Sequence, residues 1–505
     1  MVCPDMSIGF RVVIVLICAL VAVAAQVSAA PAAESSTNVE AFVAQLDDRV
    51  PRWMERAGVP GVAIALVRRG EVVWTGAFGD ADVIRQQPMT PESICRAESI
   101  SKSVTAWGVM TLVDQGLVDL DTDVEGYLGS WELSDSKYDE SEVTVRRLLS
   151  GNAGMQLGTI GPEVEYEPGS AMPPLREHLS DEALVVEEPG SMFIYSNPGF
   201  NLLQLLVEEV SGLDFADYMH QAVLSPLGMD RASYAWQPEY EGQVPNGYEL
   251  DGTPVPPYVY PAGAAGGLFA DVADIARFVA AEMVGPYYSA RGILRENSIN
   301  LIHEPQVEIG GIFGFVAESY GFGHFIETLS DGRRAVWHGG QGHGWMTHFH
   351  AVPESGDGIV ILTNSNRSWP FLARVLADWS RWNGFAPVKF SRITYATVAV
   401  WVLIGVVAAA ALLQLVRLVL GIARRRRRPA PLAGARPVLR TVEAVVGVGL
   451  VALVIWRASL PYVFETSIFP VAALWIGVSL VFAGLVLIAS ALMPKSAPFA
   501  ASGPQ

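Results

Sequence analysis

Apolar residues are concentrated at the two ends of this 505-residue chain, and the region between the ends mixes apolar and polar positions. At the N-terminus, residues 8–25 are almost entirely apolar and carry one charged side chain, Arg11. The tripeptide Val27-Ser28-Ala29 then offers small residues at the cleavage positions of a secretory signal. We expect a signal peptide over residues 1–29. An uncleaved anchor is the alternative, because basic residues before the apolar run are scarce.

Three apolar stretches at the C-terminal end are candidates for membrane helices. Between Arg392 and Arg417 lie 24 residues without a charge, which is enough to cross a bilayer. The second stretch carries Glu443 and Arg457 near its ends, and the third has no charge from 466 to 494. The expected helices are residues 394–416, 441–463 and 468–492, with a re-entrant hairpin as the alternative for the second.

Five consecutive arginines, residues 424–428, lie between the first two apolar stretches. Basic loops of membrane proteins face the cytoplasm, so this run predicts a cytoplasmic loop. Residues 30–390 would then lie on the extracytoplasmic side, in agreement with a signal peptide. A nuclear-localisation or RNA-binding role for the arginines is disfavoured, because they lie between membrane segments.

Residues 30–390 show both helical and strand periodicity. Helices are expected over residues 39–57, 99–115, 144–149, 200–210 and 271–283. Strands are expected over residues 62–67, 71–74, 93–96, 324–326, 335–337, 347–352 and 358–362. Strands at both ends with helices between them predict an α+β class: a mixed α/β domain with an antiparallel sheet and a helical region.

Charge is divided unevenly along the chain. The net charge is −18, and the residues from 391 onward carry eleven basic and two acidic side chains, so the first 390 residues carry −27. Such an acidic domain is a poor candidate for nucleic-acid binding, which needs basic surfaces. Cys95 is the one cysteine after the signal segment, and we expect it to be a small buried hydrophobe rather than a nucleophile.

The first candidate for chemistry is Ser99 with Lys102, at the start of the apolar helix. Residues i and i+3 share a helix face, so the hydroxyl and the amine can meet. A buried lysine that is partly neutral can take the proton of a serine and make it a nucleophile. The alternative is structural, with Ser99 as a helix cap and Lys102 as a solvated residue, because Ser-x-x-Lys is a short motif.

The second candidate is Tyr195 with Asn197, which point the same way in an extended segment. A phenol can relay a proton to a leaving group, and an amide can hold a lysine or a substrate carbonyl. The alternative is that Asn197 caps a helix that has Pro198 in its first turn, with Tyr195 as ordinary packing.

The third candidate is the stretch Val336-Trp337-His338-Gly339-Gly340-Gln341-Gly342-His343-Gly344. Its glycines would let a substrate lie against a strand backbone. The N–H groups of Ser99 and Gln341 could together form an oxyanion hole. The alternatives are a tight glycine turn, or a metal site at His338 or His343. No acidic or cysteine partner lies at a recognised ligand spacing, so no metal and no other cofactor is expected.

These three motifs, in this order, resemble the serine β-lactamase-related family, on the side of class C β-lactamases and penicillin-binding proteins. The resemblance covers about residues 40–385. Supporting blocks are Thr144-Val145-Arg146-Arg147-Leu148-Leu149-Ser150, Pro189-Gly190, Pro261-Ala262-Gly263, Gly266-Gly267-Leu268-Phe269 and Tyr320-Gly321-Phe322-Gly323.

The resemblance implies a role for each motif. Ser99 would be the acylated nucleophile, Lys102 and Tyr195 would share base and acid duties, and Asn197 would orient Lys102 and the substrate. His338, ahead of Gly339, Gly340 and Gln341 on the substrate-binding strand, stands where lactamases have a lysine. Members with histidine there are often esterases or peptidases acting on D-amino acids, so efficient β-lactamase activity is not expected. Glu98 departs from the small residue that usually precedes the serine.

The expected function is a membrane-anchored serine hydrolase acting on an ester or amide of a small molecule or cell-wall peptide. The rival hypothesis is a sensor that binds or acylates once and signals through its membrane helices. A transporter is less favoured, since few polar groups lie within the apolar stretches. The sequence leaves the substrate and the oligomeric state open.

Overall fold

The computed structural model describes residues 38–311, 313–430, 437–459, 466 and 468–494. Contacts divide the described chain after Arg392 into two compact units. The expected signal peptide, residues 1–29, lies outside the described residues, as does the end of the expected second membrane helix beyond residue 459.

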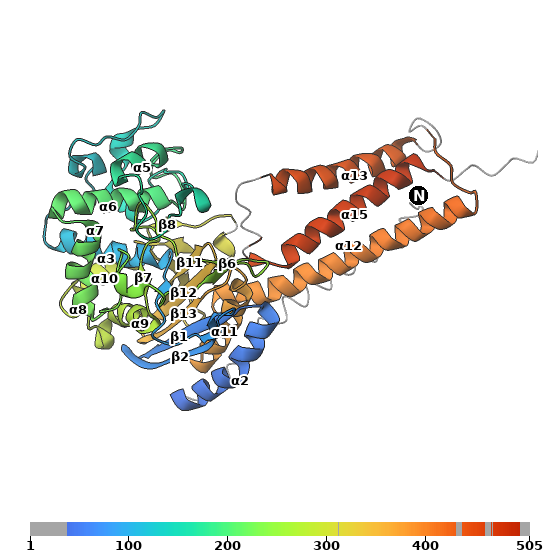
Figure 1. Cartoon of the computed structure of the whole chain (residues 1–505). Coiled ribbons are helices and arrows are strands. Elements are labelled where there is room, and N and C mark those ends of the chain that lie inside the picture. Colours follow the sequence, from blue (N-terminus) through green and yellow to red (C-terminus); the bar gives the residue numbers. More distant parts are fainter. Residues whose placement is uncertain (1–37, 312, 431–436, 460–465, 467, 495–505) are drawn as a thin grey trace, which may run out of the picture. The chain divides into compact units, whose positions relative to one another are not determined.

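An antiparallel nine-stranded sheet forms the centre of the first unit (Figure 1). Its strand order is β3-β2-β1-β13-β12-β11-β10-β9-β8, so the two ends of the unit's sequence pair at the middle of the sheet. In that order the strands are Gln87–Pro88, Glu71–Asp82, Gly61–Arg68, Asp357–Thr363, Trp345–Val352, Arg334–Gly342, Phe325–Thr328, Ser319–Tyr320 and Val307–Glu308. Two further pairs join β4 (Cys95–Arg96) to β7 (Phe269–Ala270) and β5 (Gly247–Tyr248) to β6 (Pro254–Val255).

Helices cover both faces of this sheet. The helices of the unit are α2 (Val39–Ala57), α3 (Ile100–Asp114), α4 (Val145–Leu149), α5 (Leu175–Glu182), α6 (Asn197–Ser211), α7 (Phe215–Met219), α8 (Ser225–Leu227), α9 (Val272–Ala281), α10 (Glu296–Ile302) and α11 (Trp369–Trp382). Strand β1 is buried on both sides, and only alternate residues (Ala63, Ala65, Val67) join the large core that includes α3, α6 and α9. On the other side α2 contacts α11 (Figure 1), where the rings of Phe42 and Trp382 stack 4.6 Å apart.

The fold class predicted from the sequence is confirmed, and element boundaries differ in places. The helix over Val39–Ala57 has the predicted ends, with the Asn38 side chain accepting from Ala41 N–H. Strand β2 continues to Asp82, well past the predicted end at residue 74, because its later residues pair with β1 as far as Gly79 opposite Gly61. The glycines and aspartates in this part of β2 interrupt the alternation of apolar and polar residues that predicts a strand. Their backbone groups are still satisfied by hydrogen bonds to neighbouring strands.

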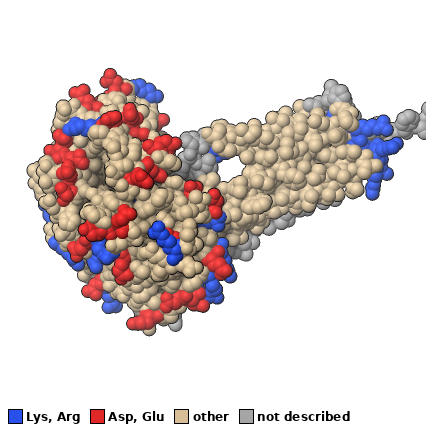
Figure 2. All heavy atoms as spheres, viewed as in Figure 1, with Lys and Arg blue, Asp and Glu red and all other residues tan. Residues whose placement is uncertain are grey.

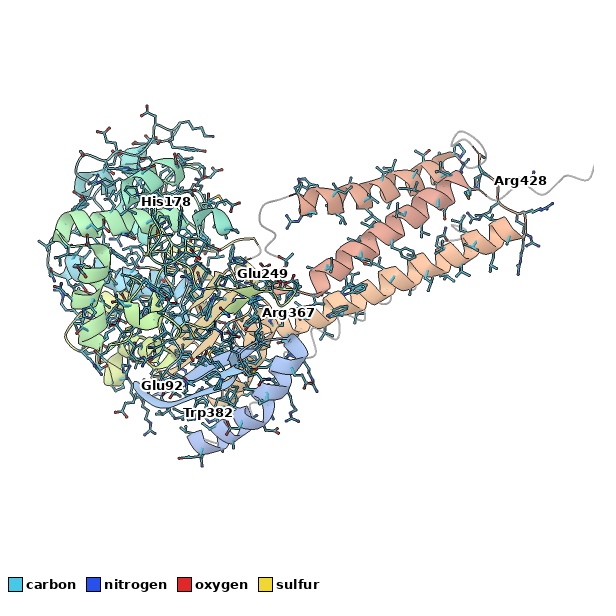
Figure 3. All side chains as sticks on the ribbon, in the orientation of Figure 1. Glu92, His178, Glu249, Arg367, Trp382 and Arg428 are labelled. Atoms are coloured by element: carbon cyan, nitrogen blue, oxygen red, sulfur yellow. The ribbon has the colours of Figure 1, made fainter. Side chains whose placement is uncertain are left out.

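The second unit consists of long apolar helices. They are α12 (Arg392–Ala423), α13 (Pro437–Ala458) and α15 (Ala472–Leu492), and each is long and apolar enough to cross a membrane. The described part of the middle stretch is a single continuous helix rather than a hairpin. Helices α13 and α15 pack closely where Gly447 meets Gly484, since a Cβ at either position would lie 2.7 Å from the other's carbonyl oxygen. Charged side chains are almost absent along these helices (Figure 2) and gather at the end that carries Arg428 (Figure 3).

Candidate active site

Ser99 lies at the N-terminal end of α3 in a helical conformation, with φ −65° and ψ −4°. The residue before it, Glu98, has φ +50°, in the left-handed region that costs a side-chain-bearing residue energy. The Glu98 carbonyl accepts hydrogen bonds from Ser101 N–H at 2.8 Å and from the Ser101 hydroxyl at 2.6 Å. This tight entry to a buried helix holds the nucleophile candidate in a fixed place.

Lys102 is fully buried one turn further along α3. Its Nζ contacts three acceptors: Asn197 Oδ1 at 2.8 Å, the Ala265 carbonyl at 2.8 Å and Ser99 Oγ at 3.3 Å. Burial lowers the pKa of Lys102 to about 7, although the Glu98 carboxylate acts in the opposite direction. A neutral amine can donate to the two nearer oxygens and turn its lone pair to the serine hydroxyl. The arrangement therefore suits proton transfer from Ser99.

Tyr195 and Asn197 enter the same cluster from the start of α6. The side chain that caps α6 is Ser196, whose hydroxyl accepts from Gly199 N–H at 3.0 Å. The alternative in which Asn197 caps the helix is therefore wrong, and the Asn197 amide oxygen is available to Lys102. Lys102 Nζ also lies 4.8 Å from the centre of the Tyr195 ring.

Strand β11 carries the glycines of the third motif and places them against Ala97 and Glu98, the two residues before Ser99. Thr347, opposite Gly340 on β12, donates its hydroxyl to the Ala97 carbonyl at 2.7 Å. A Cβ at Gly340 would lie 2.4 Å from that same carbonyl oxygen. At Gly342 a Cβ would lie 2.3 Å from the Glu98 carboxylate. The glycines therefore allow β11 to pack directly against the chain that leads into Ser99.

His338 is placed within the protein rather than at its surface. Its Nδ1 lies 2.9 Å from the Gly339 carbonyl and its Nε2 lies 3.1 Å from the Tyr320 hydroxyl. Burial, followed by the nearby Lys102, lowers the pKa of His338 well below its usual value. Nδ1–H therefore donates to the carbonyl and Nε2 accepts from Tyr320. The ring is neutral, 6.0 Å from the Tyr195 ring, and fully buried.

Glu98 does not present its carboxylate to a substrate. Arg96 Nε donates to Oε1 at 2.6 Å, and the hydroxyls of Tyr258 and Tyr260 donate to Oε1 and Oε2 at 3.0 and 3.1 Å. The side chain is 2% exposed, so this buried ion pair anchors the turn before Ser99. Arg96 and the two tyrosines hold the Glu98 side chain, and no sequence motif indicated them.

His343, the second histidine of the glycine stretch, lies between two carboxylates. Its Nδ1 is 2.9 Å from Glu165 and its Nε2 is 2.9 Å from Glu249, which is labelled in Figure 3. Hydrogen bonding to Glu165, together with Glu249, raises the pKa of His343 to about 9. The ring is therefore an imidazolium that donates to both carboxylates at neutral pH.

A match between the sequence and a protein-family model shows the family of this chain. The Beta-lactamase family model matches residues 39–378, which include all three motifs. The chain belongs to the beta-lactamase family. The resemblance stated from the motifs is confirmed by this match.

Two curated relatives of this chain carry different names. Protein flp of Staphylococcus aureus (strain N315) is 23% identical over 331 residues, which cover 64% of each chain. A D-aminopeptidase of Gluconobacter oxydans (strain 621H) is 26% identical over 355 residues, which cover 67% of this chain and 62% of that protein. The match thus spans less than two thirds of either relative.

Solved structures share the fold of the first unit. The octameric penicillin-binding protein homologue from Pyrococcus abyssi is 27% identical with a TM-score of 0.58, covering 68% of this chain and 78% of that one. A class C beta-lactamase is 19% identical with a TM-score of 0.55, covering 66% of this chain and 94% of that one. The chain has the fold of beta-lactamase-family serine hydrolases.

Proposed function

We propose that this protein is a membrane-anchored serine hydrolase that forms an acyl-enzyme on Ser99, with its catalytic unit outside the cytoplasmic membrane. The observation that carries the proposal is the 3.3 Å contact between Ser99 Oγ and the buried Nζ of Lys102, whose pKa is about 7. An amine with that pKa is partly neutral at physiological pH and can act as a general base.

In the acylation step, Ser99 Oγ attacks the carbonyl carbon of an ester or amide as its proton passes to neutral Lys102, from which Tyr195 can relay a proton to the leaving group. The negative charge on the carbonyl oxygen is stabilised by the N–H groups of Ser99 and Gln341. The bond to the leaving group breaks, and the alcohol or amine departs with the proton. Asn197 holds Lys102 in line throughout.

In the deacylation step, water adds to the acyl carbon and gives a proton to the same base. The acyl–Oγ bond then breaks, the acid product leaves and Ser99 recovers its proton. No metal or organic cofactor takes part in this scheme. The division of acid and base duties between Lys102 and Tyr195 is left open.

The proposed substrate is an ester or amide of a small molecule or cell-wall peptide. A relative named D-aminopeptidase supports peptides with D-residues as candidates. A neutral, buried His338 cannot supply the permanent charge that a lysine offers to a substrate carboxylate, which disfavours β-lactams.

The nucleophile is tested with the full chain purified in detergent. A fluorophosphonate probe is expected to label the wild type and Ser191→Ala, an exposed serine near Tyr195, to the same extent. Ser99→Ala is expected to lose labelling and to lower p-nitrophenyl acetate hydrolysis by at least ~10³-fold, because the proposed acyl-enzyme forms on the Ser99 hydroxyl. Unchanged hydrolysis by Ser99→Ala would refute the assignment.

Substrate class is tested on the same preparation with p-nitrophenyl acetate, a D-alanyl-D-alanine peptide, penicillin and nitrocefin. Turnover of the ester or the peptide with slow nitrocefin hydrolysis is expected. Rapid nitrocefin hydrolysis would contradict the role inferred for neutral His338. A single burst without steady-state turnover on every substrate would favour the rival hypothesis, a sensor that acylates once.

Sidedness is tested with a membrane-impermeant serine probe. The run of arginines between α12 and α13 supports a cytoplasmic loop, which leaves the catalytic unit outside. Ser99 in intact spheroplasts is therefore expected to react as fast as in lysed ones. Labelling that appears only after lysis would place the catalytic unit in the cytoplasm.

A further inference from the structure

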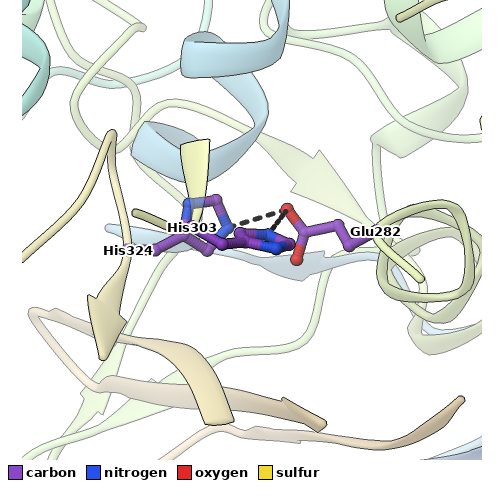
Figure 4. A group of neighbouring side chains, drawn as sticks. All are labelled: Glu282, His303 and His324. Atoms are coloured by element: carbon purple, nitrogen blue, oxygen red, sulfur yellow. Dashed lines mark ion pairs between the residues drawn. The ribbon is translucent and has the colours of Figure 1, made fainter. Parts of the chain in front are cut away.

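A buried group of two imidazoles and one carboxylate lies outside the active site (Figure 4). Glu282 follows α9, His303 follows α10, and His324 lies just before β10. One possible ligand atom from each lies within 4.8 Å of the other two, and all three side chains are at most 3% exposed. From this geometry we propose that the three residues bind one divalent late transition-metal ion, with Zn²⁺ as the best fit.

The first argument is the tautomer of His324. Its Nδ1 lies 2.8 Å from the Phe322 carbonyl, so Nδ1 carries a proton and donates it. This contact is typical of histidine ligands and places Nε2 opposite Glu282 Oε1 at 2.8 Å. At that distance the two atoms need either a proton on Nε2 or a cation between them. Nε2 makes no hydrogen bond of acceptable geometry with the carboxylate, which favours the cation.

The second argument is the set of atoms without hydrogen-bond partners. Among the described residues, Glu282 Oε2, His303 Nε2 and His324 Nε2 make no hydrogen bond of acceptable geometry, although all three are buried. Leaving buried polar atoms unpaired costs about 1–3 kcal/mol each. An ion bound between the imidazoles and the Glu282 carboxylate would give both Nε2 atoms a partner and neutralise the carboxylate.

The ligand set and its spacing favour zinc. Two histidine nitrogens and a carboxylate oxygen match known zinc ligand sets, with bonds of about 2.0–2.2 Å. Tetrahedral bonds of that length separate ligand atoms by about 3.3 Å. The distances from Glu282 Oε1 to His324 Nε2 and His303 Nε2 are 2.8 and 3.7 Å, on either side of this value. Small shifts of the side chains would bring the three ligand atoms, already within 4.8 Å of one another, to this spacing.

The position suggests a structural role behind the catalytic helix. Trp107 of α3 donates its indole N–H to Glu282 Oε1 at 3.2 Å. Gly323, next to His324, accepts from the Ser103 hydroxyl at 2.6 Å. A metal here would tie the segments after α9 and α10 and before β10 to the helix that carries Lys102. Because the site is closed to solvent, it suits stability rather than catalysis.

Sequence spacing could not reveal this site. Each of the three residues is separated from the next by about twenty positions, and they come from three separate segments. The expectation that no metal is bound considered only His338 and His343. The tertiary fold alone brings the ligands together.

The test uses the full chain purified in detergent without metal-affinity resin. Elemental analysis is expected to find about one zinc per chain. Dipicolinic acid is expected to lower the Tm, and added Zn²⁺ to restore it, since a ligand that binds only the folded state stabilises it. Zinc-free protein whose Tm responds to neither chelator nor Zn²⁺ would overturn the proposal and leave a protonated histidine–carboxylate pair.

Variants locate the bound ion. His303→Asn and Glu282→Gln are expected to lose the zinc and the response of Tm to chelator. Glu327→Gln is the matched control, because Glu327 forms a buried pair with His350 at 3.5 Å that is not part of any three-ligand group in the described chain. This control is expected to keep its zinc even if its Tm falls. Full zinc content in both ligand variants would overturn the proposal, and the wild-type chelation result decides the question if they do not fold.

Discussion

At the scale of single residues, the proposed catalysis depends on the protonation state of the Lys102 amine. Lys102 has three acceptors around it and no solvent, so its charged form loses hydration while its neutral form keeps two good hydrogen bonds. Glu98 limits the effect because its carboxylate favours the charged form. The balance leaves the amine with a pKa of about 7, which suits the proposed role as a general base.

The pH dependence of kcat/KM tests this reading of Lys102. The active form is the neutral amine, so kcat/KM is expected to rise tenfold per pH unit below about pH 7 and to level off above it. Lys102→Met is expected to lose at least ~10²-fold in activity at all pH values. Lys137→Met, which removes an exposed lysine on another segment, is the control and should keep the full profile. A rising limb that survives in Lys102→Met would assign it to another group.

At the scale of elements, the site depends on how closely β11 approaches the entry to α3. A side chain at Gly340 would collide with Thr347 Oγ1 at 2.1 Å and the Ala97 carbonyl at 2.4 Å. A side chain at Gly339 would meet its nearest atoms at 3.5 Å, which is ordinary contact. Neighbouring glycines of one motif therefore differ in what they allow.

Alanine substitutions separate these two glycines. Gly340→Ala is expected to cost about 1–3 kcal/mol of stability, because the strand and the chain before Ser99 are forced apart. It is also expected to lower kcat/KM by ~10²-fold or more through displacement of Ser99. Gly339→Ala, the matched control, is expected to change stability by less than ~1 kcal/mol. Equal Tm values for the two variants would show that the close approach at Gly340 has no energetic consequence.

The elements also show what a sequence can predict. The α3 helix, its Ser99–Lys102 spacing and the central strands follow from local periodicity, and the structure contains them. The hydrogen-bond partners of Lys102 do not follow from local periodicity. The Ala265 carbonyl reaches Lys102 from a turn 163 residues away, and Asn197 is free to bind Lys102 because Ser196 caps α6. Such contacts come from chain topology, which leaves no periodic signal in the residues that make them.

At the scale of the whole molecule, two units with different surfaces share one chain. The large core of the first unit is built from residues between Ala63 and Leu362, entirely before the apolar helices. Most of the exposed large apolar side chains lie instead between Tyr395 and Leu492. An exposed apolar surface of that extent is unstable in water and suited to lipid.

This division predicts that the catalytic unit does not need the helices to fold. A chain containing residues 32–392 is expected to be monodisperse without detergent, because no part of its core is removed. Its kcat/KM on p-nitrophenyl acetate is expected to lie within about twofold of the full chain in detergent, since Ser99, Lys102, Tyr195 and Asn197 all lie within it. The complementary measurement is fractionation, in which only the full chain should stay with the membranes after a high-salt wash. A shortened chain that aggregates or fails to react with a serine probe would mean that the helices contribute to the fold of the catalytic unit, and that anchoring and catalysis are not separable in this protein.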